Sequence, residues 1–178
     1  MSRSTSYELL AFYRGEGTDR AGRTFADVQG LSDAQLESTH DYIQWLFPLF
    51  TASPYAPEAP TLDQEALHAF RSDAFLRSKV IGALRRMLEF YGLELDDTEP
   101  TDIVIDVGTR FPERRRNWLT PDNHNYRRIT RILTSLQLLG LGAYARALLD
   151  CLVVLYREHA GRIGPKAYSR WTAAVGRQ

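Results

Sequence analysis

Apolar side chains recur every three or four residues through the second half of the chain, and this spacing constrains the fold more than any other feature. Between residues 122 and 139 the spacing places five aliphatic side chains on one helix face: Ile129, Ile132, Leu133, Leu136 and Leu139. Residues 143–159 are apolar on nearly every side, which predicts a helix surrounded by its neighbours. Pro165 suits the first turn of a final helix. The second half of the chain is therefore predicted to be helical.

Helix start and stop residues extend this prediction to the first half. Ser32 and Gln35 form a capping box for a helix over residues 33–47, and Pro48 should end it near Leu46. Three more helices are expected, over residues 7–13, 61–70 and 73–91.

Residues 93–108 break the helical pattern. Residues 103–107 could form one short strand, but an isolated strand is unstable, so we expect a packed loop. The predicted fold class is all-α: one globular domain over residues 1–178, with six to seven helices and no significant sheet.

The charges are balanced overall but unevenly placed. With 22 Lys+Arg and 22 Asp+Glu, the chain has no net field that would attract nucleic acid, and no nucleic-acid partner is expected. Residues 94–106 are acidic, whereas residues 110–131 are rich in arginine. Either neighbouring segments neutralise each other, or the arginines form an anion-binding face.

The chain contains one cysteine, Cys151, so an intrachain disulfide is impossible and a reducing compartment is expected. No segment approaches the ~20 apolar residues of a membrane span. We therefore expect a soluble, cytoplasmic protein without a membrane span.

Two strings resemble the conserved domain of the opioid growth factor receptor family: HDYIQWLFPLF over residues 40–50 and NHNYRRITRIL over residues 123–133. Shorter matches occur in the same order at Phe12-Tyr13, Leu36-Glu37, Met87-Leu88, Phe90-Tyr91-Gly92 and Asn117-Trp118-Leu119. The resemblance implies an α-helical domain and, in vertebrate members, a receptor associated with the nucleus that responds to a pentapeptide opioid growth factor. We expect a ligand- or peptide-binding domain without catalytic chemistry or a cofactor.

Arginine makes up nearly all of the basic residues, since only Lys79 and Lys166 are lysines. This skew indicates a GC-rich, bacterial coding sequence. We accordingly expect a small stand-alone member of the family.

The candidate ligand-binding residues come from the two strings and from the segment before the second: His40, Gln44, Trp45, Trp118, His124, Asn125, Arg128 and Arg131. His40 precedes Gln44 by one turn of the predicted helix and shares its apolar stripe, so its ring should point inward. Such a histidine is either structural, bonded to backbone or to Asn125, or part of a pocket with an aromatic wall. Arg128 or Arg131 could bind the carboxylate of a small acidic ligand, a peptide or a partner protein.

Two Glu-x-x-His motifs offer an alternative. Glu37 with His40, and Glu65 with His68, have the spacing found in helical bundles that bind two metal ions. The alternative function is a metal-dependent enzyme built on a helical bundle.

Overall fold

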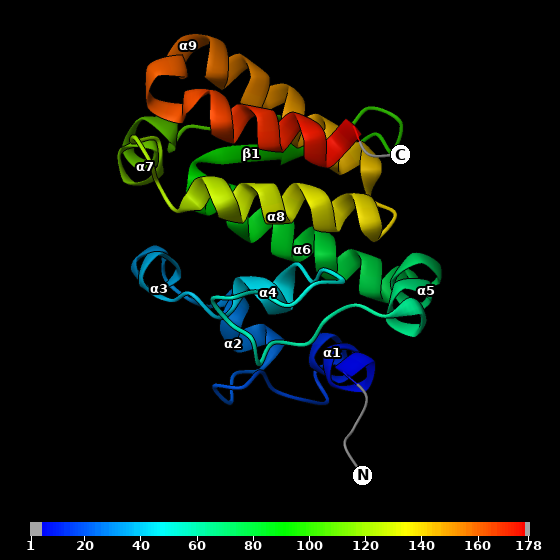
Figure 1. Ribbon diagram of the computed structural model, residues 1–178. Coiled ribbons are helices and arrows are strands. Elements are labelled where there is room, and N and C mark those ends of the chain that lie inside the picture. The colour runs from blue at the N-terminus through cyan, green and yellow to red at the C-terminus, as the bar shows by residue number, and fades with distance from the viewer. Residues whose placement is uncertain (1–4, 177–178) are drawn as a thin grey trace. The chain divides into compact units, whose positions relative to one another are not determined.

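The computed structural model describes residues 5–176, and most of these residues are helical (Figure 1). The chain divides into two compact units, Met1–Ala83 and Leu84–Gln178. Helix α6 (Ala74–Tyr91) runs through the boundary and contributes to both units.

The first unit consists of short helices and loops around an aromatic core. Its helices before α6 are α1 (Thr5–Arg14), α2 (Phe25–Gln29), α3 (Asp33–Ser38), α4 (Ile43–Leu46) and α5 (Gln64–Ser72). The Tyr13 ring meets that of Phe70 edge-on with centroids 4.8 Å apart, and its hydroxyl donates to the Leu46 carbonyl. Burial raises the pKa of Tyr13, because the phenolate would lose its hydration. The buried hydroxyl thus links α1 to the end of α4.

The second unit packs helices and a small sheet. After α6 it contains β1 (Leu93–Asp96), β2 (Val104–Val107), α7 (Phe111–Trp118), α8 (Asn125–Leu138) and α9 (Gly142–Gly176). Helix α9 is broken at His159 and Gly164, and the chain reverses there, so that Pro165 begins a second helical segment (Figure 1). The predicted stripe of α8 is buried, and its last residue, Leu139, follows the helix.

Two aspects of the predicted fold class are wrong. The described residues form nine helices rather than six to seven, since α2 and α7 were not expected. They also form a two-stranded antiparallel sheet, in which Leu93 pairs with Val107 and Asp96 with Val104. The strand expected to be isolated therefore has a partner, which is the start of the acidic segment. There Leu93 and Leu95 alternate with the carboxylates of Glu94 and Asp96. The fold is therefore mostly helical rather than strictly all-α.

The helix predicted over residues 33–47 is divided into α3 and α4. The predicted capping box is present. The Ser32 hydroxyl accepts from the backbone N–H of Gln35, and the Gln35 side chain accepts from the backbone N–H of Ser32. The helix nevertheless stops at Ser38, since Thr39 is extended at φ −96° and ψ 133°. Helix α4 ends at Leu46, two residues before Pro48, as predicted.

Helix α8 begins at Asn125, so the predicted start at residue 122 was three residues early. Asp122 has φ 56° and does not cap the helix. Among the described helices, none combines the length and apolar character needed to cross a membrane.

Candidate functional site

Gln44, a candidate ligand-binding residue, has a local structural role in the first unit. Its side chain is buried, and one end of its amide lies 3.2 Å from the Asp41 carbonyl oxygen and 3.3 Å from that of His40; because both of these are acceptors, we assign the amide nitrogen to this end. In this orientation the amide oxygen accepts from the Ser53 hydroxyl at 3.3 Å. Gln44 therefore holds the turn between α3 and α4 and attaches the loop that contains Ser53.

His40 does not point inward as predicted, because its side chain is exposed. The extended conformation of Thr39 ends α3, so His40 no longer continues the apolar stripe that starts at Leu36. The next tryptophan, Trp45, is 2% exposed and packs on the Phe12 ring with centroids 5.1 Å apart. The first string thus contains one exposed imidazole beside a buried amide and a buried indole.

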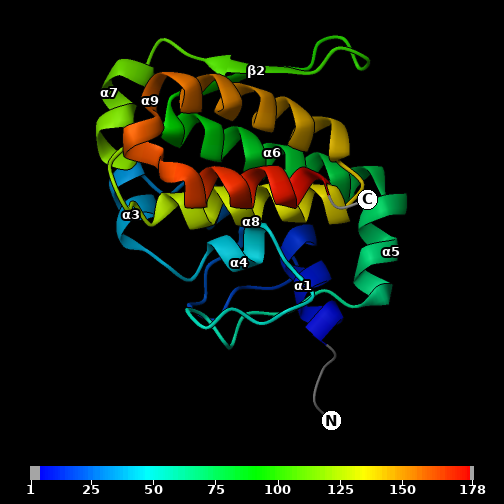
Figure 2. The same ribbon diagram turned by 45° about the horizontal axis from the view of Figure 1, so that its top comes forward.

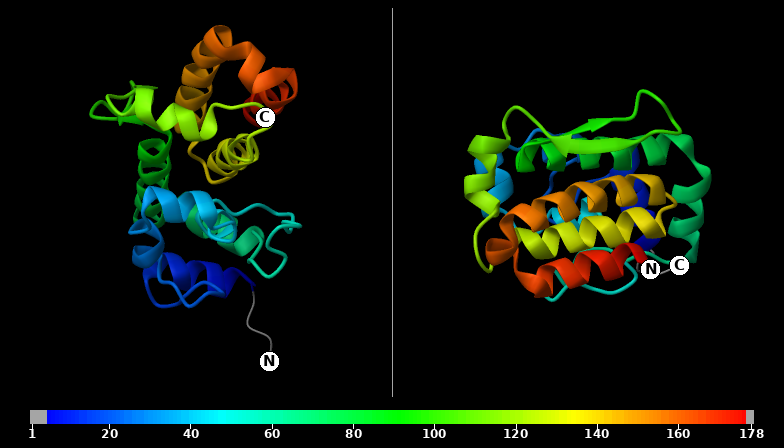
Figure 3. Two further views of the ribbon diagram at one scale, coloured as in Figure 1. Left: turned by 90° about the vertical axis from the view of Figure 1, so that its left-hand side faces the viewer. Right: turned by 90° about the horizontal axis from the view of Figure 1, so that it is seen from above.

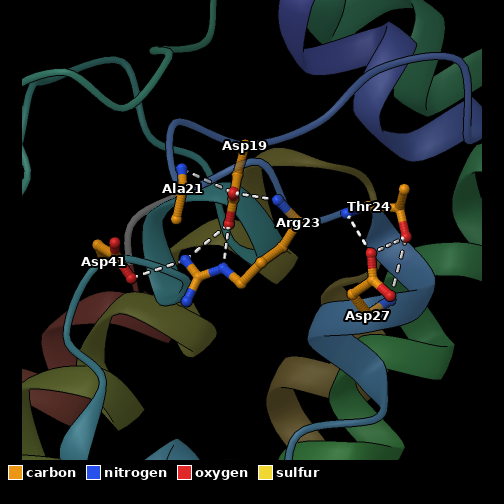
Figure 4. A network of polar contacts seen from close by, with 6 residues as sticks. All are labelled: Asp19, Ala21, Arg23, Thr24, Asp27 and Asp41. Atoms are coloured by element: carbon orange, nitrogen blue, oxygen red, sulfur yellow. Dashed lines mark hydrogen bonds and ion pairs between the residues drawn. The ribbon is translucent and has the colours of Figure 1, made fainter.

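A network of charged groups fixes the position of the chain next to His40 (Figure 4). The buried carboxylate of Asp19 accepts from the backbone N–H groups of Ala21 and Arg23, both at 2.9 Å, and from Nε of Arg23 at 2.7 Å. Nη2 of Arg23, which lies 2.6 Å from Asp19, also donates to Asp41 at 2.7 Å. Burial alone would lower the pKa of Arg23, but the hydrogen bonds to Asp41 and Asp19 raise it overall. Arg23 therefore connects the loop before α2 to the turn before α4.

Sequence reasoning missed this network. The available signal was an Asp followed by Gly three residues later, with Gly22 at φ +79°. Such residues mark a turn whose Asp side chain can bind nearby backbone amides. The participation of Asp41 has no comparable local signal.

The candidates of the second unit cluster around the start of α8. Asn125 is buried, and its backbone N–H donates to the Asn123 side chain at 2.9 Å. Its own side-chain oxygen accepts from Arg128 at 3.2 Å, and Arg128 is 5% exposed. Asn125 therefore holds a buried guanidinium.

The other three candidates in this unit differ in exposure. His124 is exposed at the N-cap position of α8, without a side-chain capping bond. Burial lowers the pKa of Arg131 to about 10, which leaves the guanidinium protonated at neutral pH. Trp118 is fully buried and donates from Nε1 to the Tyr91 carbonyl at 3.0 Å. His124 is therefore more accessible than Arg131 or Trp118.

The acidic stretch is partly paired within the second unit. Asp97 forms an ion pair with Arg85 of α6 and accepts from the Tyr144 hydroxyl at 3.1 Å. Arg85 lies outside the arginine-rich stretch of residues 110–131. Neutralisation of that stretch by the acidic segment stays a prediction.

The two Glu-x-x-His motifs receive no support as a metal site. Glu37 lies in α3 while His40 lies beyond its end, so the two do not share a helix. Glu65 and His68 are both exposed on α5. Within residues 5–176, no three His, Cys, Asp or Glu side chains are close enough to hold a metal ion.

A cavity of about 190 Å³ in the first unit does not involve the candidates. Its lining residues are Tyr7, Leu10, Ala11, Arg14, Glu16 and Glu65. A pocket formed jointly by six of the candidates stays a prediction; these six are His40, Gln44, Trp45, His124, Asn125 and Arg128.

A family model and individual relatives both match the same protein family. The sequence model of the family described as "Opioid growth factor receptor (OGFr) conserved region" matches residues 25–160, which include all eight candidates. The opioid growth factor receptor of Mus musculus is 39% identical over 109 residues, or 61% of this chain and 17% of its own length. The receptor of Homo sapiens is 36% identical over 138 residues, which cover 74% of this chain and 20% of the receptor.

A related protein extends the comparison. The opioid growth factor receptor-like protein 1 of Mus musculus is 38% identical over 121 residues, or 67% of this chain and 25% of its own length. The match thus spans a quarter or less of these relatives. They are vertebrate proteins and give the expected bacterial origin no support. No solved structure matches the chain.

Proposed function

Because the chain belongs to the family of the opioid growth factor receptor conserved region, we propose that it is a non-enzymatic binding domain whose ligand is a peptide. The observation that carries the proposal is the family match over residues 25–160, which covers both strings and every candidate residue. The names of the relatives refer to an opioid growth factor, and a peptide of this class is the first ligand to test.

Exposed and buried candidates are expected to have different roles in binding. His40 and His124 are exposed and can contact a ligand directly, because each imidazole offers a nitrogen donor and a nitrogen acceptor. Gln44 and Asn125 are buried and bind their neighbours, so they position the chain rather than touch the peptide. Arg131, which keeps its charge at neutral pH, could receive a peptide carboxylate.

The test is titration of the protein into a fluorescently labelled opioid growth factor pentapeptide, followed by anisotropy. We expect saturable binding, weakened by roughly fivefold or more in His124→Gln or His40→Gln, as loss of one hydrogen bond would cause. His68→Gln is the matched control, because His68 is an exposed histidine on α5 outside the candidate set.

Two results would overturn the proposal. One is the lack of saturable binding up to millimolar protein. The other is an equal effect of all three histidine substitutions, which would indicate a non-specific surface interaction. Circular dichroism should confirm that the three variants stay folded, since all three side chains are exposed.

The cytoplasmic location expected from the sequence remains part of this proposal. Fractionation of cells that express the tagged chain tests it, and recovery in the membrane or secreted fraction would contradict it.

A further inference from the structure

Helix α7, the start of α8 and the turn of α9 lie side by side at one end of the second unit (Figures 2 and 3), and each of these segments contains exposed basic residues. We call this region the cationic end, and its exposed basic residues are Arg115, Arg116, Arg127, Arg157, Arg162 and Lys166. The same segments contain three carboxylates, Glu113, Asp122 and Glu158. Of these, Glu113 lies 3.8 Å from Arg110 and Glu158 lies 3.8 Å from His159.

Tyr126 joins the three elements that form the cationic end. Its hydroxyl donates to the Thr120 carbonyl at 2.8 Å and lies 3.3 Å from the Arg162 carbonyl in the turn of α9. Its ring packs edge-on against Trp118 at the end of α7, with centroids 6.5 Å apart. Burial raises the pKa of Tyr126 to about 12, so the hydroxyl stays protonated at neutral pH. Tyr126 therefore connects the end of α7 and the turn of α9 to the start of α8.

Two charges of the cationic end, those of Arg115 and Arg116, are not paired within the described residues. The side chains of Arg115 and Arg116 form no hydrogen bond or ion pair with any residue from 5 to 176. Their position in the last turn of α7 is favourable for a cation, because the helix dipole is negative there. Lys166 has no such benefit, since it follows Pro165 at the start of a helical segment. Local helix electrostatics thus explains only part of the cluster.

We propose that the cationic end binds an acidic segment of a partner protein. Five of its six basic groups are arginines, whose planar guanidinium can donate two parallel hydrogen bonds to a carboxylate. None of the six basic residues is among the eight candidates above, so the inference does not depend on the proposed peptide site.

Nucleic acid fits this surface less well than an acidic polypeptide. In the cationic end Trp118 and Tyr126 are buried, and the half-buried rings of Tyr156 and Tyr168 stack on each other with centroids 4.0 Å apart. Each of these two tyrosine rings already covers one face of the other, so unpaired bases would find little free ring surface on which to stack.

The probe for the test is a fluorescein-labelled peptide of ten glutamates, with ten glutamines as the neutral comparison. The informative variant is Arg115→Gln/Arg116→Gln. The matched control is Arg146→Gln/Arg170→Gln, which removes two exposed arginines of α9 outside the cationic end. Its net charge equals that of the Arg115→Gln/Arg116→Gln variant.

We expect the glutamate peptide to bind the wild-type chain, more weakly as salt rises, and the glutamine peptide not to bind. The Arg115→Gln/Arg116→Gln variant should bind roughly 5- to 30-fold more weakly, as loss of two exposed charge pairs predicts. The control should bind within about twofold of wild type.

Three outcomes would overturn the inference: no binding of the glutamate peptide, equal weakening in both double variants, or tighter binding of a short duplex DNA than of the peptide. The opioid pentapeptide assay separates the two proposals. Arg115→Gln/Arg116→Gln should leave pentapeptide binding unchanged. If the wild-type chain binds the glutamate peptide but not the pentapeptide, only the proposed peptide function is contradicted.

Discussion

Removal of the Asp19 carboxylate should destabilise the first unit more than removal of the Asp41 carboxylate, although both contact the same arginine. Asp19 is fully buried at its side chain, whereas that of Asp41 is 50% exposed. Asp19→Ala deprives two backbone N–H groups of their acceptor, at about 1 kcal/mol each, and removes the main partner of the Arg23 guanidinium. With a further ~1 kcal/mol for that partly exposed pair, the expected loss is about 3 kcal/mol of unfolding free energy.

Two milder substitutions separate the contributions. Asp19→Asn retains an oxygen for the two backbone donors but turns an amide nitrogen toward Arg23, so we expect a loss of about 1 to 2 kcal/mol. Asp41→Asn affects an exposed pair and should cost below about 0.5 kcal/mol. Glu8→Gln, which weakens the exposed pair between Glu8 and Arg20, is the control and should resemble Asp41→Asn.

Urea unfolding followed by circular dichroism at pH 7 measures all four variants. The expected order of destabilisation is Asp19→Ala, then Asp19→Asn, then Asp41→Asn together with Glu8→Gln. A loss for Asp41→Asn as large as that for Asp19→Ala would refute the reasoning, since burial would then not decide the contribution of each carboxylate.

Three further predictions concern the core, the backbone and the cysteine. Trp45→Ala and Leu136→Ala should each lower the unfolding free energy by roughly 2 to 5 kcal/mol, because both side chains are buried; an unchanged melting temperature would contradict this. Gly92→Ala should cost over about 2 kcal/mol in urea unfolding, because Gly92 has φ +78° and a Cβ would lie 2.7 Å from Cα of Phe111. Gly22→Ala, with φ +79° and open space, should cost only about 1 kcal/mol, and equal losses would exclude the clash. Burial, with a smaller effect of Asp106, raises the pKa of Cys151 to about 12, so a thiol reagent at pH 8 should modify it only after unfolding. The folded state holds the thiol proton more tightly, so this stabilisation is complete below about pH 9 and is lost as pH rises toward 12; stability unchanged over that window would contradict the burial.

The candidate site was only partly predictable from residue spacing. Trp45 is buried, as expected of a core aromatic residue, but the helical stripe did not predict the burial of the Gln44 amide. The orientation of His40 was predicted wrongly, because a capping box and a stripe cannot reveal that the backbone becomes extended at Thr39. The carbonyls of His40 and Asp41 instead bind the Gln44 amide, which satisfies backbone groups that a continuous helix would otherwise have bonded.

Residue spacing and helix-terminating residues located most of the long helices, and two sequence strings identified the family that the chain resembles. Helical hydrogen bonds and side-chain neighbours are only three or four residues apart, so the stripe of α8 and the glycine after α6 could be recognised locally. Tertiary structure alone decided the pairing of β1 with β2 and the connection of Asp19 through Arg23 to Asp41. These contacts join residues up to some 20 positions apart, and their formation depends on packing that brings distant segments together rather than on the conformational preference of any one segment.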